Sequence, residues 1–133
     1  MADVTRARQI AAKACHWVRR HPREWEELKR ICTYLMEEGD LVQRGNLYAL
    51  AGRYGIEVRL GGTFRRDHNL WSALGRYMVM ERPELLSAIR FRETPLDEVD
   101  LVSYWRDIVG EDCFVAGSLA EAREVWAVQR GAR

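Results

Sequence analysis

Residues 5–37 read TRARQIAAKACHWVRRHPREWEELKRICTYLME, and this stretch decides the fold of the chain. In its first half, apolar residues recur every three or four positions: Ala7, Ile10, Ala14 and Val18. In its second half the same spacing returns with Trp25, Leu28, Ile31, Cys32 and Leu35. Because this spacing is typical of amphipathic helices, the sequence predicts one helix over residues 5–20 and another over residues 22–37.

The ends of these two helices also follow from the sequence. Pro22 lacks a backbone N–H and suits the first turn of a helix, so the His21-Pro22 pair separates the first helix from the second. Gly39 is a natural stop for the second helix, since glycine readily takes the left-handed conformation that ends helices.

The middle of the chain mixes helical and alternating patterns. Asn46 is a good N-cap for a short helix over residues 46–54. After it, two alternating runs surround Gly61-Gly62, which predicts a β-hairpin over residues 56–66, with an irregular loop as the alternative. A longer apolar stripe then predicts a helix over residues 69–81.

The segment after this helix alternates once more. Ile89-Arg90-Phe91-Arg92 predicts a short strand that ends before Pro95. Together with the hairpin, this strand predicts a mainly α protein with a small β element, an α+β fold that could take a winged-helix-like arrangement.

Two further helices are expected in the tail. Apolar residues predict one helix over residues 96–109, which Gly110 ends. Ser118-Leu119-Ala120-Glu121 is a capping-box signature and predicts the start of the last helix.

The charge of the chain is uneven although its net value is +1. Residues 1–92 contain 17 Lys and Arg against 11 Asp and Glu, whereas residues 93–133 contain 4 against 9. We expect a single domain over residues 1–133, in which residues 93–133 could form an acidic helical C-terminal extension. The basic part points to an anionic partner, although attraction between the two parts explains the same asymmetry.

Composition and motifs exclude several functional classes. Cys15, Cys32 and Cys113 are odd in number and far apart, which predicts free and mostly buried thiols. They lack the close Cys and His pairs of metal sites, so we expect no metal and no cofactor. The sequence contains no recognised catalytic or phosphate-binding motif, so we expect no enzyme. Without an apolar span or signal peptide, the chain is expected to be cytoplasmic, with no membrane partner.

A surface for duplex DNA is the leading functional hypothesis from the residues. A helix that enters the major groove needs polar and basic groups near its N-terminus, and the helix at 69–81 begins among such groups. Basic side chains of the expected hairpin and strand could hold the phosphate backbone. The candidate DNA-binding residues are Arg59, Arg65, Arg66, His68, Asn69, Arg76, Arg90 and Arg92.

The chain also resembles small proteins of actinobacterial prophages and mobile elements. The resemblance rests on residues 17–25 (WVRRHPREW) and 64–97 (FRRDHNLWSALGRYMVMERPELLSAIRFRETPLD), and it leaves the acidic tail out. It implies a winged-helix-like accessory or regulatory protein and assigns no functional residue.

The sequence therefore predicts a non-catalytic accessory protein that binds DNA through a winged-helix-like face. The alternative is an adaptor for another protein or a homodimer, anchored by exposed tryptophans. Its candidate anchors are Trp17, Trp71, Trp105 and Trp126.

Overall fold

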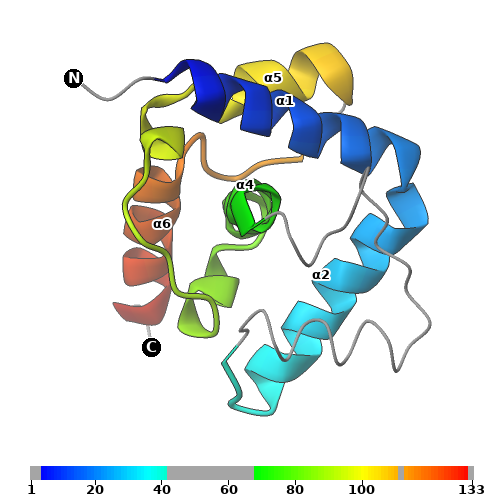
Figure 1. Cartoon of the computed structure of the whole chain (residues 1–133). Helices are drawn as coiled ribbons and strands as arrows, with labels where there is room; N and C mark the ends of the chain where they lie inside the picture. Colours follow the sequence, from blue (N-terminus) through cyan, green and yellow to red (C-terminus); the bar gives the residue numbers. More distant parts are fainter. Residues whose placement is uncertain (1–3, 42–67, 111–112, 132–133) are drawn as a thin grey trace.

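The helix α4, His68–Glu81, lies at the centre of the molecule, and the other helices pack around it (Figure 1). The computed structural model describes residues 4–41, 68–110 and 113–131. In chain order, the described elements are α1 (Thr5–Arg20), α2 (Pro22–Glu37), α4, the 3-10 turns η1 (Pro83–Ser87) and η2 (Pro95–Glu98), α5 (Leu101–Ile108) and α6 (Leu119–Gly131). Helices α1 and α6 both contact α4, and α5 packs on α1.

The predictions for α1 and α2 are confirmed. The apolar stripe of α1 is buried, with Ala11 and Ala14 fully inaccessible. The boundary between the two helices is built by His21, whose ring stacks on Trp17 at 5.2 Å between centroids and whose Nδ1 lies 3.0 Å from the Trp17 carbonyl oxygen. Pro22 then occupies the first turn of α2, as its missing N–H favours.

An aromatic cluster and a hydrogen-bonded chain hold α4 to its neighbours. The Tyr77 ring lies 5.0 Å from Trp105 and 5.7 Å from Phe114, between centroids. The Tyr77 hydroxyl donates to the Leu101 carbonyl oxygen at 2.8 Å and accepts from the Cys15 thiol at 3.2 Å. One side chain of α4 thus links α1 with α5 across the core.

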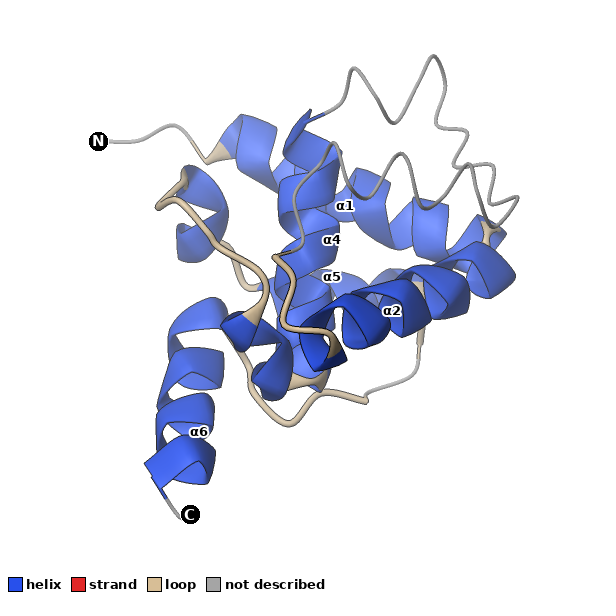
Figure 2. Cartoon of the chain, turned by 90° about the horizontal axis from the view of Figure 1, so that it is seen from below, coloured by secondary structure: helices blue, strands red, loops and turns tan. Residues whose placement is uncertain are grey.

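The prediction of a small β element is wrong. The described residues contain helices, turns and loops but no strand (Figure 2), and helices account for 76% of them, so the fold is all-α rather than α+β. Ile89 makes a single isolated β-bridge, too short for the expected strand over residues 89–92. The expected helix at 46–54 and hairpin at 56–66 lie outside the described residues.

The alternation at residues 89–92 has another cause. Ile89 is buried in the core, and the Phe91 ring packs over Gly75, where an added Cβ would meet it at 3.1 Å. Arg90 and Arg92 are exposed, and the Arg92 carbonyl oxygen accepts a hydrogen bond from the Arg76 side chain instead of from a neighbouring strand. Residues 89–92 therefore alternate between apolar and basic because side-chain contacts hold an extended segment, not because they form a strand.

Of the two helices predicted in the tail, the first is wrong in its extent and the second begins where it was predicted. The expected helix over residues 96–109 is split into η2 and α5, because Thr94 and Asp97 form a capping box around η2 and Asp100 separately caps α5. The last helix begins after Ser118, as its signature predicts: the Ser118 hydroxyl accepts from the Glu121 N–H at 3.1 Å. The Glu121 carboxylate accepts in turn from the Gly117 N–H.

Candidate functional site

Five of the eight DNA-binding candidates lie among the residues that the structure describes. Arg59, Arg65 and Arg66 lie outside the described residues. His68 and Asn69 are the first two residues of α4, as the prediction of a helix N-terminus there required. The remaining three candidates are Arg76 on α4 and Arg90 and Arg92 on the segment that follows η1.

Arg76 is a structural residue, which corrects its assignment to a DNA surface. It is only 1% exposed. Its Nε donates to Asp97 Oδ1 at 2.8 Å and its Nη2 to Asp97 Oδ2 at 3.2 Å, while the other hydrogen bonds go to the carbonyl oxygens of Ser72 and Arg92. The guanidinium also lies over the Phe91 ring, 5.2 Å from its centroid. With its nitrogens occupied in the interior, Arg76 cannot reach a phosphate.

The partner of Arg76 has a shifted pKa. Burial alone would raise the pKa of Asp97. Hydrogen bonds from Arg76 and from the Thr94 N–H, together with the charges of Arg76 and Arg123, lower it below the usual value. Asp97 is therefore ionised at neutral pH and balances the buried guanidinium.

Residues 70–80 of α4 are not placed to read DNA. Every residue from 70 to 80 is buried except Ser72, which is half-buried. The structure places α1 and α6 against it, and α2 lies on a further side (Figure 1). A recognition helix contacts base edges through exposed side chains, and no residue of α4 from 70 to 80 is fully exposed.

A second buried cation links α2 to α4. Lys29 is 3% exposed, and its Nζ lies 2.9 Å from both Glu26 Oε1 and Glu81 Oε2. Its ammonium also lies over the Trp25 ring, 5.4 Å from the centroid. These contacts satisfy the buried charge, so Lys29, like Arg76, serves the fold.

The cysteines are poor nucleophiles in this structure. Burial raises the pKa of Cys15 to about 11 and that of Cys32 to about 12. Cys113 is exposed, contrary to the expectation of burial, yet desolvation and the neighbouring Glu81 carboxylate raise its pKa to about 11. All three therefore stay protonated near neutral pH, whereas the thiolate is the reactive form.

The described residues offer neither a metal site nor a membrane-spanning helix. No three side chains of His, Cys, Asp or Glu gather there in a way that could hold a metal ion. None of the described helices combines the length and the apolar character needed to cross a bilayer.

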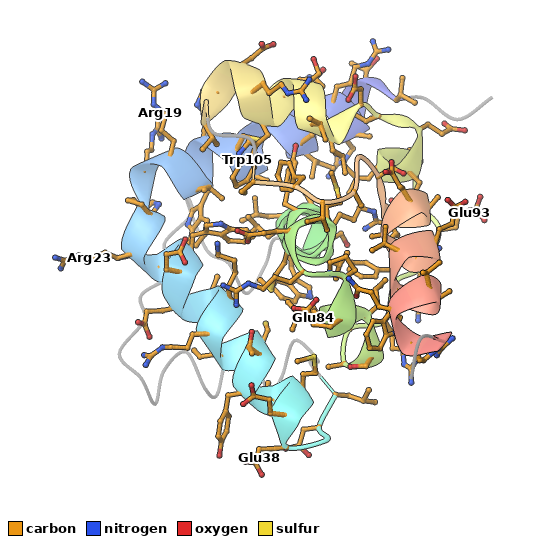
Figure 3. The ribbon with its side chains drawn as sticks, turned by 180° about the vertical axis from the view of Figure 1, so that it is seen from behind. Arg19, Arg23, Glu38, Glu84, Glu93 and Trp105 are labelled. Atoms are coloured by element: carbon orange, nitrogen blue, oxygen red, sulfur yellow. The ribbon has the colours of Figure 1, made fainter. Side chains whose placement is uncertain are left out.

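The tryptophans do not form the exposed patch that an adaptor would need. Trp17, Trp25, Trp71 and Trp105 are at most 9% exposed. Trp105 points into the core among the other aromatic rings (Figure 3). Trp126, on α6, is half-buried.

A group of exposed cations lies on α1. Six exposed cations occupy this helix and the first turn of α2, and we call them the α1 basic face: Arg6, Arg8, Lys13, Arg19, Arg20 and Arg23. Residues 4–23 contain no Asp or Glu. Arg19 and Arg23 point outward from the corner between the two helices (Figure 3).

The helix geometry places the cations of α1 in two rows along the two edges of its exposed half. Arg6, Lys13 and Arg20 are seven residues apart and so lie in one row along α1. Arg8 and Arg19 lie at the other edge of the same exposed half, because the buried half is occupied by the stripe that contacts α4 and α5. Among the described residues, no carboxylate forms an ion pair with Arg8, Arg19, Arg20 or Arg23.

The α1 basic face was missed from the sequence, although its signal is present there. The amino-acid sequence of residues 4–23 contains six Lys and Arg residues and no Asp or Glu. Sequence reasoning favoured residues 59–92 because helix and hairpin patterns adjoin there, as in a DNA-reading motif. The chain matches no protein-family model, no curated protein and no solved structure.

Proposed function

We propose that this protein binds duplex DNA through the α1 basic face. The observation that carries the proposal is the run of six exposed cations on α1 and the start of α2, with no Asp or Glu between residues 4 and 23. A surface of one sign over this length attracts a polyanion, since each cation that neutralises a phosphate releases a condensed counterion.

The dimensions of α1 suit a nucleic-acid backbone. A helix of 16 residues is about 24 Å long at about 1.5 Å per residue. Duplex DNA presents roughly one phosphate per 1.7 Å of its axis, so several phosphates lie within reach of such a face. Because the other half of α1 is buried against α4 and α5, the cations are held in place by the core.

The proposed contacts are to phosphates rather than to base edges. Five of the six cations are arginines, whose planar guanidinium groups suit bidentate phosphate contacts. Phosphate contacts position a protein on DNA but carry no direct sequence information. We therefore expect binding that tolerates many sequences and depends steeply on salt.

The test measures binding of a fluorescently labelled duplex of mixed sequence by anisotropy at several salt concentrations. If six phosphates are contacted, the affinity falls about 10³-fold between roughly 50 and 200 mM salt. The variant Arg19→Gln/Arg20→Gln removes two contacts. We expect it to lower the slope of log affinity against log salt by about 2 and the affinity at low salt by about tenfold.

A matched control removes the same charge elsewhere. Arg30→Gln/Arg92→Gln changes two exposed arginines, one on α2 and one on the segment that sequence reasoning assigned to DNA. We expect its salt slope to equal that of the unchanged protein. Equal losses in both variants would mean that only net charge matters, and an absence of binding by the folded protein at low salt would refute the proposal.

A further inference from the structure

A hollow beside α6 combines cations with a partly exposed aromatic ring. It has a volume of about 570 Å³ and lies between α6 and the segment that follows η1. Its charged lining residues are Arg90, Arg123 and Arg130, and the aromatic ones are Phe91 and Trp126. None of the described residues that line it carries a carboxylate. The volume falls within the range of about 300–1,000 Å³ that small-molecule sites span.

The lining residues of α6 share one face of that helix. Arg123, Trp126 and Arg130 are spaced by three and then four residues, so their side chains lie in a row. Helix α6 packs against η1 (Figure 1). Arg90, on the segment that follows η1, lines the hollow together with the residues of α6. Cations from two segments of the chain and Trp126 therefore line the same hollow.

Trp126 differs from the other tryptophans of the chain. The other four are at most 9% exposed, whereas Trp126 is half-buried and lines the hollow. A partly exposed indole offers a stacking surface for a flat aromatic group, and nucleobases stack on such rings in proteins that bind single strands.

The arginines define the other half of the ligand. Arg90, Arg123 and Arg130 are all exposed, and Arg123 is close enough to Asp97 to lower the pKa of that carboxyl. Asp97, which lies outside the lining, thus offsets part of the charge of Arg123, whereas the lining itself carries three guanidinium groups and no carboxylate. Guanidinium groups bind phosphates through paired hydrogen bonds.

We propose that this hollow binds a phosphorylated nucleoside, with the base stacked on Trp126 and the phosphates held by Arg90, Arg123 and Arg130. The ligand is a free nucleoside triphosphate or the 5′-phosphorylated end of a nucleic-acid strand, which share this chemistry. The site uses residues other than those of the α1 basic face, so it stands or fails separately from the proposed DNA binding.

The test titrates the full chain with ATP in a calorimeter and compares adenosine and inorganic tripolyphosphate. We expect saturable binding of ATP and at least tenfold weaker binding of each fragment, because each lacks one half of the contacts. Arg123→Gln/Arg130→Gln should weaken ATP binding about 100-fold if each lost charged contact costs about tenfold. Trp126→Ala should weaken it about tenfold, whereas Trp126→Phe should retain most of the affinity.

Control variants and competing strands complete the experiment. Arg30→Gln/Arg106→Gln removes the same charge from exposed positions on α2 and α5, and we expect unchanged ATP affinity. Competition by a 5′-phosphorylated hexanucleotide, but not by its unphosphorylated form, would assign the site to strand ends; no competition would assign it to free nucleotides. Absence of ATP binding at millimolar concentration, or tripolyphosphate binding as tightly as ATP with no effect of Trp126→Ala, would overturn the proposal.

Discussion

Arg76 shows how the environment of a single residue reverses its interpretation. On a helix with one apolar face, its position would be solvent-exposed, away from Leu74 and Tyr77. Because α4 is covered on its other sides too, the guanidinium is inside and needs a counter-ion. Asp97, 21 residues further along the chain, supplies it. The ion pair therefore belongs to the fold, and it ties the acidic tail to the basic part.

The first prediction concerns this pair. Asp97→Asn leaves the Arg76 charge buried without a carboxylate, so we expect the free energy of unfolding to fall by about 3 kcal/mol. Urea denaturation at pH 7 measures it. Asp107→Asn, at an exposed position on α5, is the control and should change stability by less than about 0.5 kcal/mol. A loss no larger than that of the control would show that the pair contributes little.

Asp97 also makes the stability of the fold depend on pH in the acid range. The pKa of Asp97 is lower in the folded chain than in the unfolded one. Its contribution is therefore present above the unfolded pKa of about 3.9 and is lost as the pH falls through the folded value. The Asn variant lacks this group, so the difference between the two proteins should narrow below about pH 4.

At the scale of elements, sequence patterns identified those helices whose boundaries are set locally. Helices α1 and α2 each bury one stripe, and Pro22 and Ser118 mark starts by side-chain chemistry alone. The strand at 89–92 was wrong because its period came from burial of Ile89 and packing of Phe91, which are tertiary contacts.

The candidate site was less predictable than the helices. The sequence shows which residues are basic. It does not show that α4 is buried on nearly all sides whereas one side of α1 is exposed to solvent. Arg76 was therefore placed on the surface, and the α1 basic face was overlooked. Likewise, Arg90 and Arg123 both line the hollow beside α6 although they are 33 positions apart in the chain, and no local pattern predicts this.

The N-cap of α6 gives the prediction at this scale. Ser118→Ala removes the hydroxyl that accepts from the Glu121 N–H, so we expect stability to fall by about 1 kcal/mol. Ser118→Asp keeps an acceptor and should restore most of it. Ser103→Ala, inside α5, is the control and should be neutral or slightly stabilising, since alanine has the higher helix propensity. Thermal unfolding followed by circular dichroism compares the three variants.

At the scale of the whole molecule, buried weak acids connect the helices of the core. Cys15 of α1 and Cys32 of α2 are fully inaccessible, and Tyr77 of α4 bonds to both Cys15 and the start of α5. Burial raises the pKa of all three groups above their ordinary values, to about 11 for Cys15 and about 12 for Cys32. The folded chain therefore holds these protons at pH values where the unfolded chain has released them.

This difference predicts that the protein loses stability in alkali. The unfolded thiols ionise near pH 9 and the folded ones only about two to three units higher, so the unfolded state binds fewer protons above pH 9. Stability is then constant with respect to these groups below about pH 8 and falls by up to about 1.4 kcal/mol per pH unit for each thiol above pH 9. Urea denaturation under reducing conditions at several pH values between 7 and 11 measures the slope.

Cys32→Ala removes one thiol and should lower the alkaline slope by up to about 1.4 kcal/mol per pH unit, whatever its effect on stability at pH 7. Parallel alkaline limbs in the two proteins would show that Cys32 ionises alike in the folded and unfolded chain, in conflict with its burial between α2 and the core.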